Sequence, residues 1–483
     1  MVQTHFTAVG TCWSRLSVAA AILLLMAVGM PQRCIAQNRH PQIFVGSAFG
    51  LNQMLDRSRW PYVAANADGF YNHTWGWSPP RTFPNHYPPF TAADQKKLVA
   101  NFTHKSALLE GGLDSSQSAL PTSEAGTHWD HDTVQEMAKL GMNTPTIVVD
   151  DILPDKAMTP TPTVFTEQWQ TFCSNNTTNR YAPGMASYVL TAEWAIEPTG
   201  PITAAGWEWL RQDVLAPHCG GMGFDGPVNF YAPTDPVFRG AKYVQTVHDT
   251  IRWVQQNGRK FVYLASPIND SPSERWLQDF KENVQGLEDS DAEPDFYGIE
   301  TYCLNSAKDG PNVALTPEKN TDGSPANTIT GAAYYALKHR DGDPGTLTLA
   351  AALADRLPGS PEHALAWPAP GRQAHYALTL RNTSHWLDYA AILHASRIDD
   401  RKGFTVRFEI NGEDATSAVL GSGYVFYKKQ RLQPASNRQV DVYLKTPSIG
   451  RMRRRSDPVP TVKIMLLPHS GSAPLATLTV GAK

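Results

Sequence analysis

Cysteine is scarce in this sequence. Five cysteines occur among 483 residues, and two of them, Cys12 and Cys34, lie in the first 36 residues. The other three are Cys173, Cys219 and Cys303, and no two of them have the spacing of a metal site. We therefore expect neither a Cys/His zinc site nor a dense disulfide framework.

Several other features are also missing. The formal net charge is only -3, so nothing global points to a nucleic acid or to an acidic membrane surface as a partner. No G-x-G-x-x-G follows a predicted strand, which disfavours a dinucleotide-binding sheet. No G-x-S-x-G is present, which disfavours a standard esterase. No D-x-D-x-D loop is present either, so we expect no metal and no cofactor.

The N-terminus has the pattern of a secretory signal. Arg15 precedes an apolar stretch from Val18 to Met30, and Ala36 offers a small residue before a cleavage point. The stretch is short of the roughly 20 residues that a membrane span needs, and no later segment is long and apolar enough. We predict a signal peptide over 1–36 and a secreted or periplasmic protein, with an uncleaved anchor as the alternative.

Residues 41–342 alternate between predicted strands and predicted helices. Eight strand–helix units in one run are the count of a (β/α)8 TIM barrel, and a doubly wound open sheet is the competitor. The expected strands are Ile43–Ala48, Gly69–Trp75, Ser106–Leu109, Thr144–Val149, Ala186–Ala192, Pro227–Tyr231, Lys260–Ser266 and Asp295–Ile299.

Residues 343–483 have a different pattern. Short β-rich runs follow one another without helical segments, and Asn411-Gly412 is a hairpin turn signal. This pattern predicts an all-β sandwich domain. The basic run Arg451–Arg455 is either a solvated hairpin tip or a contact for an acidic polymer or cell-surface sugar.

Polar residues follow almost every predicted barrel strand. In a TIM barrel the C-terminal strand ends form one rim, where the working residues stand. An aromatic loop, Trp75–Phe90, follows the second strand, and aromatic faces in loops often stack on sugar rings. The predicted substrate-binding residues are Asn72, His73, Trp75, Trp77, Glu110, Asp150, Asp151, Trp194, Tyr231, Asp270 and Tyr302.

Two strand-end glutamates are the preferred catalytic pair. Glu193 and Glu300 each end an apolar strand and lie beside an aromatic residue. Glycoside hydrolysis needs one protonated carboxyl group and one ionised carboxylate, so a pair of this kind suits it. The alternative is that one or both glutamates are ion-paired rim residues. Asp150-Asp151 is a rival site, although adjacent strand residues point to opposite sides and only one can face the barrel axis.

The layout of signal peptide, (β/α)8 barrel and C-terminal β-sandwich resembles that of secreted glycoside hydrolases. The resemblance rests on Asp150, Glu193 and Glu300 and on the loop Trp75–Phe90. The large group with glutamates on strands four and seven usually has Asn before the first glutamate. Here Ala192 precedes Glu193, and the glutamates follow predicted strands five and eight, so the resemblance identifies no specific family.

The primary hypothesis is therefore a secreted glycoside hydrolase whose partner is a poly- or oligosaccharide. A non-catalytic glycan-binding or cell-surface protein on the same scaffold is the alternative, and a phosphodiesterase or lyase is a third possibility with little support. We further predict that Cys173 and Cys219 form a disulfide, because each follows an outer helix at the same end of adjacent units. Cys303 would then be the unpaired thiol.

Overall fold

The structure is a computed structural model in which Met1–Arg39 and His40–Lys483 are separate units, and the elements described below lie in the second unit. It describes residues 41–47, 51–73, 91–112, 128–150, 162–192, 204–227, 241–266, 275–300, 313–354, 364–398, 403–427, 430–448, 459–469 and 473–481. The predicted signal peptide over 1–36 and the basic run Arg451–Arg455 lie outside these residues. None of the helices in the described ranges combines the length and the apolar composition that crossing a membrane requires.

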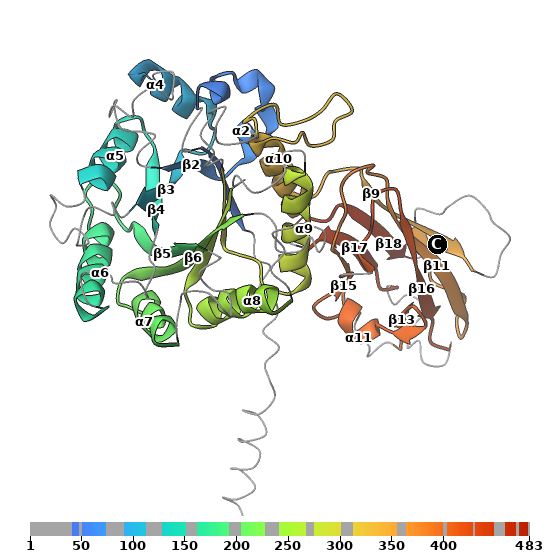
Figure 1. Ribbon diagram of the computed structural model, residues 1–483. Helices are drawn as coiled ribbons and strands as arrows, with labels where there is room; N and C mark the ends of the chain where they lie inside the picture. Colours follow the sequence, from blue (N-terminus) through green and yellow to red (C-terminus); the bar gives the residue numbers. More distant parts are fainter. Residues whose placement is uncertain are drawn as a thin grey trace, which may run out of the picture. The chain divides into compact units, whose positions relative to one another are not determined.

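The first part of the unit is a closed eight-stranded parallel barrel with helices around it, as Figure 1 shows. Each strand pairs with its neighbour in the chain, and β8 pairs with β1 to close the ring. The predicted (β/α)8 architecture is confirmed. The strands are β1 (Gln42–Gly46), β2 (Gly69–His73), β3 (Ser106–Gly112), β4 (Asn143–Asp150), β5 (Ala186–Ala192), β6 (Cys219–Pro227), β7 (Lys260–Ser266) and β8 (Phe296–Ile299).

Helices connect the strands on the outside of the barrel. Local sequence explains where several begin: Thr91 and Asp94 form a reciprocal capping box at the start of α4, and the Thr328 side chain accepts from the Gly331 amide at the start of α10. The helices are α2 (Pro61–Asn66), α4 (Ala92–Asn101), α5 (His128–Lys139), α6 (Pro162–Thr177), α7 (Ala204–Val214), α8 (Ala241–Gln256), α9 (Trp276–Asp289) and α10 (Ile329–Asp341).

Two predicted elements differ in the structure. The sequence predicts a first helix near Gln53–Ala65. In the structure this stretch is divided into the 3-10 turns η1 (Leu51–Leu55) and η2 (Arg57–Arg59) and the short helix α2, because Pro61 starts a new helix. The sixth strand is Cys219–Pro227, not Pro227–Tyr231. Its glycines resemble a loop in sequence, but a Cβ at Gly221 would lie 1.9 Å from the Lys260 carbonyl oxygen, so β7 approaches too closely for a side chain.

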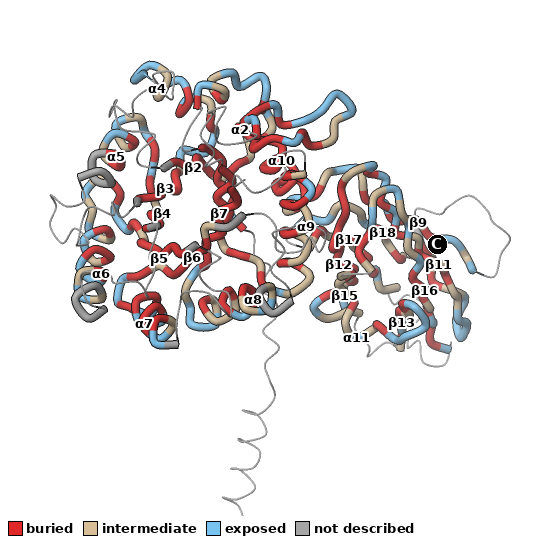
Figure 2. Tube along the Cα trace, in the orientation of Figure 1, coloured by how far each residue is buried: buried red, intermediate tan, exposed pale blue. Residues whose placement is uncertain are grey.

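Apolar side chains fill both sides of the barrel wall. One buried cluster lies in the lumen and includes Phe44, Tyr71, Leu108, Tyr188 and Leu264. Residues of opposite parity on the same strands, such as Phe70, Leu109 and Val189, join the larger cluster beneath the helices. The barrel is therefore a packed core and not a pore, and Figure 2 shows its strands almost entirely buried.

The C-terminal part is the predicted β-sandwich. Its two five-stranded sheets have the orders β10-β18-β17-β12-β15 and β14-β13-β16-β11-β9. Alternating burial along β16 shows one face of a sheet turned to the core. The elements are β9 (Leu347–Leu353), β10 (Ala364–Ala366), β11 (Gln373–Asn382), β12 (Ala391–Ala395), β13 (Thr405–Ile410), β14 (Glu413–Asp414), α11 (Thr416–Val419), β15 (Tyr424–Val425), β16 (Asn437–Lys445), β17 (Val462–Pro468) and β18 (Ala476–Gly481). The predicted division at residue 343 falls between α10 and β9.

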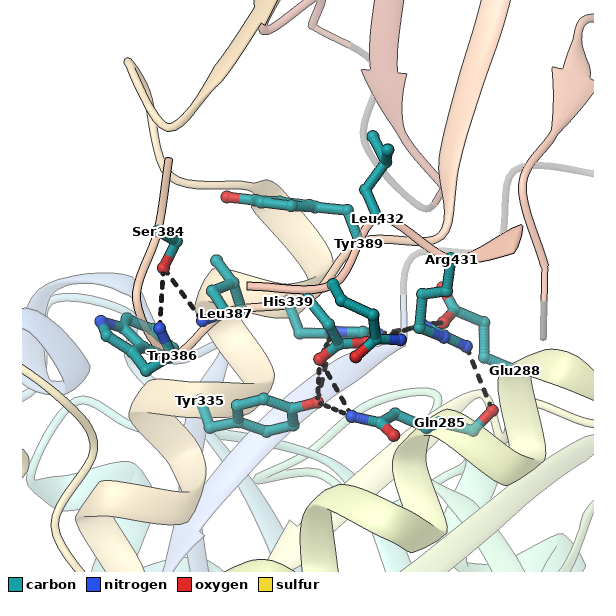
Figure 3. A network of polar contacts seen from close by, with 12 residues as sticks. Gln285, Glu288, Tyr335, His339, Ser384, Trp386, Leu387, Tyr389, Arg431 and Leu432 are labelled. Carbon is teal, nitrogen blue, oxygen red and sulfur yellow. Dashed lines mark hydrogen bonds and ion pairs between the residues drawn. The ribbon is translucent and has the colours of Figure 1, made fainter. Parts of the chain in front are cut away.

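A buried network of charges joins barrel helices to the β-sandwich (Figure 3). Arg431 is buried and donates to Glu288 at 2.6 Å, to Asp289 at 2.5 Å and to Asp388 at 3.1 Å. His339 of α10 contacts the same Glu288 carboxylate at 3.1 Å. Burial alone would raise the pKa of Glu288, but the charges of His339 and Arg431 hold it below its usual range.

Candidate active site

Strand register decides which strand-end side chains face the barrel axis. Side chains alternate along each strand, and lumen residues such as Leu108 and Leu264 mark the inward parity. By this criterion Glu110 of β3, two residues beyond Leu108, faces inward at the C-terminal rim. Glu300 has the same parity as Phe296 of β8, which also lies in the lumen cluster. The rim therefore carries carboxyl groups that point toward its centre.

Glu110 is held from below by the packed lumen. Its side chain is 1% exposed, and the Tyr71 hydroxyl donates a hydrogen bond to its Oε2. Tyr71 pairs with Leu108 across β2 and β3, one layer below the glutamate. A phenol that donates to a carboxylate stabilises its ionised form and fixes its orientation.

Glu300 follows β8 directly and is also 1% exposed. Its main-chain amide donates to the Ala265 carbonyl oxygen at 3.1 Å, so the β7–β8 ladder fixes its backbone. Placement on a strand end and not on a free loop gives this carboxyl group a defined direction.

Asp225 is a rim carboxylate that the sequence analysis missed. It lies on β6, where it pairs with Ala192 of β5 and with Leu264 of β7. Because Asp225 is in register with Leu264, which lies in the lumen cluster, its side chain also faces inward. Ser266 of β7, two residues beyond Leu264, is the next inward-facing position of that strand. Glu110, Asp225 and Glu300 thus come from strands three, six and eight of the closed ring. An eight-stranded barrel is only wide enough for side chains, so these carboxyl groups converge on one small region.

Asn72, a predicted substrate-binding residue, does not have the inward parity of Glu110. It lies between Tyr71, which faces the lumen, and His73, and it shares the parity of Phe70 beneath the helices. Its amide is buried, with no hydrogen-bond partner within the described residues. The Asn72 side chain therefore faces away from the barrel axis and is not among the proposed substrate contacts.

The other predicted site residues fall into two groups. His73 and Asp150 are the last residues of β2 and β4, where they pair in register with Glu110 and Gly112 of β3. The remaining ones lie outside the described residues: Trp75, Trp77, Asp151, Glu193, Trp194, Tyr231, Asp270 and Tyr302. Among the residues that the structure does describe, no group of three His, Cys, Asp or Glu side chains is placed to hold a metal ion.

The predicted disulfide is not formed. Cys173 of α6 and Cys219 of β6 are both buried free thiols. Burial raises the pKa of the Cys173 thiol, and a hydrogen bond with Cys219 raises it further, so the two sulfurs are neighbours without being bonded. The Cys219 thiol donates to main-chain carbonyls of Ser187 and Gly221, at 3.5 and 3.4 Å. Disulfide geometry is strict, and proximity along adjacent units does not guarantee it. Cys303 lies outside the described residues.

No protein-family model and no curated protein sequence matches this chain. Solved structures similar to it include a modular endo-β-1,4-mannanase from Cellulomonas fimi, of glycoside hydrolase family 26. That match has 10% identity and a TM-score of 0.37, and it covers 92% of this chain and 95% of the mannanase. A family 30 xylanase from Clostridium acetobutylicum matches at 9% identity and a TM-score of 0.33, over 84% of this chain and 96% of the xylanase.

A curdlan-specific exo-β-1,3-glucanase from Blastomyces gilchristii matches at 12% identity and a TM-score of 0.32, over 61% of this chain and 97% of the glucanase. Because these scores and identities are low, the fold assignment rests on the strand order itself. The chain has an eight-stranded parallel barrel followed by antiparallel sheets, and the solved structures similar to it are glycoside hydrolases of several families, none of which is fixed as its own.

Proposed function

We propose that the barrel mouth hydrolyses glycosidic bonds in a poly- or oligosaccharide. The observation that supports this most is the convergence on the C-terminal rim of three inward-facing carboxyl groups, those of Glu110 and Glu300, which are buried, and that of Asp225. Glycoside hydrolysis uses two carboxyl groups and no cofactor, so this donor set suits it. We also propose that residues 1–36 direct export, which would bring the protein to extracellular or periplasmic glycans.

Glu300 is the first member of the proposed catalytic pair. One carboxylic acid protonates the glycosidic oxygen, while the second carboxylate attacks the anomeric carbon or activates a water. Glu193 is the partner predicted from sequence, and Glu110, held by Tyr71, is the competing partner that the described rim offers. A separation of roughly 5 Å between the two groups would give retention, and one of roughly 6.5–9.5 Å would give inversion.

Aromatic and polar residues near the rim would form the sugar subsites in this proposal. They are the residues predicted from sequence: His73, Trp75, Trp77, Asp150, Asp151, Trp194, Tyr231, Asp270 and Tyr302. Indole and phenol rings stack on the apolar faces of pyranose rings, and the short polar side chains can bind sugar hydroxyls.

Single Glu→Gln variants test the assignment. We expect E300Q to lower kcat for a soluble polysaccharide on the order of 10²–10⁴-fold, because the amide can neither donate the proton nor attack. The same loss in E193Q, or instead in E110Q, identifies the second carboxyl group. The matched control is E136Q on α5, since Glu136 is an exposed residue whose ion pair among the described residues is with Lys139.

Melting temperatures of all four variants should stay near that of the parent, so that a loss of rate reports chemistry and not unfolding. Full activity in E300Q would overturn the proposed role of this residue. Tight glycan binding by the parent without any product would favour the alternative of a non-catalytic glycan-binding protein.

A further inference from the structure

A groove of about 530 Å³ lies on the outer wall of the barrel, between α7 and α8. It is lined by Trp207, Arg211, Thr246, Asp249, Thr250 and Trp253. Figure 1 shows both helices outside the ring of strands, at β5 and β6. The groove is therefore separate from the carboxyl groups that face the barrel axis.

Helical spacing aligns the lining residues. Trp207 and Arg211 are four residues apart on α7, so their side chains lie one above the other. On α8, Thr246, Asp249, Thr250 and Trp253 follow the i, i+3, i+4, i+7 pattern of a single helix face. Two indole rings, one from each helix, thus flank a strip of polar groups.

Both tryptophans are only half-buried. Each packs one side against the main core and leaves the rest toward the groove. The Arg211 guanidinium on α7 lies 5.7 Å from the centre of the Trp253 ring on α8. This distance is at the outer limit of a cation–π contact. The arrangement leaves part of each indole ring accessible from the groove.

The charges of the groove balance. Arg211 and Asp249 supply one charge of each sign, with side chains 50% and 62% exposed. Asp249 accepts from Gln245 at 2.8 Å, and the Thr250 hydroxyl donates to the Thr246 carbonyl oxygen at 2.8 Å while it can still accept. A strongly ionic ligand gains nothing from balanced charges, and a purely aliphatic ligand would desolvate both charged groups at a cost.

We propose that this groove binds a neutral carbohydrate chain as a second, non-catalytic site. Pyranose rings combine apolar C–H faces, which stack on indoles, with hydroxyls that hydrogen-bond to guanidinium, carboxylate and threonine groups. The volume falls within the range of roughly 300–1,000 Å³ that small-ligand sites occupy. The inference goes beyond the proposed function, because it concerns binding on the outer wall and requires no chemistry at the mouth.

Calorimetric titration of the E300Q protein with cellohexaose, mannohexaose and xylohexaose tests the proposal. At least one of these sugars should bind the groove, and adding W207A or W253A to E300Q should weaken that binding at least tenfold. W253F should retain most of it, since the phenyl ring keeps an aromatic face. In the otherwise wild-type chain, turnover of a short aryl glycoside should be unchanged by W207A and W253A, because it reports only the mouth.

The variants R211A and D249A guard against misfolding, because both side chains are largely exposed and their removal should leave the melting temperature unchanged. We expect each of them to weaken binding of the same hexasaccharide severalfold. The proposal would be overturned if W207A, W253A, R211A and D249A all left binding unaffected, or if none of the three sugars bound. Failure of E300Q to lose hydrolytic activity would overturn the proposed function without touching this inference.

Discussion

Tyr71 connects the packed lumen of the barrel to its mouth. Its ring belongs to the lumen cluster, and its hydroxyl donates to Glu110 at the rim. A change in the interior layer can therefore alter a rim carboxylate without touching substrate. We regard Tyr71 as a positioning residue for Glu110.

The variant Y71F removes the hydroxyl and keeps the ring. Loss of the hydrogen bond should make the ionised form of Glu110 less favourable. If Glu110 acts as the carboxylate, we expect the acid limb of the kcat/KM profile to move to higher pH and kcat to fall roughly tenfold or more. The control is Y188F, which alters another tyrosine of the same lumen cluster and should leave the pH profile in place. An unmoved acid limb in Y71F would exclude Glu110 as the ionised partner.

At the scale of single elements, β6 shows where sequence patterns succeed and fail. Short apolar runs predict β5 and β7 to the residue, because buried parallel strands read as nearly continuous hydrophobic runs. The glycines of β6 carry no such signal, and the need for them appears only when β7 is placed beside them. Since the strand was placed eight residues late at its start, Asp225 was not recognised as a rim residue, whereas Glu110 and Glu300 were.

Strand register explains a second difference between the predicted site and the structure. Asn72 and Glu110 both end apolar strands in the sequence, but the parity of each strand depends on its pairing partners. Pairing turns Glu110 inward and Asn72 toward the helices. The sequence alone therefore predicts which residues reach the rim better than it predicts which of them face the axis.

The α6–α7 contact contains a buried acid with an altered proton affinity. Asp213 of α7 is fully buried, and its carboxylate accepts from the Thr166 hydroxyl of α6 at 2.8 Å. Burial raises the pKa of Asp213 from 3.8 to about 7. At a pH between these two values, the Asp213 carboxyl group therefore stays protonated in the folded protein, whereas it has lost its proton in the unfolded chain. By linkage, this group makes the free energy of unfolding decrease as pH rises from about 4 to about 7.

The variant D213N removes this titration and keeps the shape of the side chain. We expect it to unfold with a free energy on the order of 3 kcal/mol higher than the parent at pH 8, and with little difference at pH 4. Urea unfolding at both pH values measures the effect. A stability difference that is the same at pH 4 and pH 8 would show that Asp213 does not carry the pH dependence.

For the molecule as a whole, the Arg431 network is a buried link between the β-sandwich and the barrel helices. Glu288 and Asp289 belong to α9, His339 to α10, and Asp388 and Arg431 to the C-terminal part. Gln285 of α9 also donates to Asp388, at 2.9 Å. Arg431 is the cation common to Glu288, Asp289 and Asp388, and Figure 3 shows it beside Glu288. Its removal leaves the buried carboxylates of Glu288 and Asp388 without this cation.

The variant R431A should destabilise this attachment strongly. Breaking a buried charge pair on one side typically costs about 3–5 kcal/mol, because the remaining charges stay desolvated. We expect urea unfolding to separate into two transitions, since the sandwich would detach before the barrel unfolds. The control is R397A, whose guanidinium lies at the surface and donates to the Leu420 carbonyl oxygen. A single transition with an unchanged midpoint in R431A would contradict the proposed role of the network.

The most direct test of the central claim is to incubate the purified protein with mannan, xylan and glucan in water enriched in heavy oxygen, and to examine the products by mass spectrometry. The account predicts shorter oligosaccharides that carry one heavy oxygen at each new reducing end, and no such products from E300Q. Unsaturated products without heavy oxygen would show a lyase. No product from any of these polysaccharides, despite measurable binding, would contradict hydrolysis at the mouth.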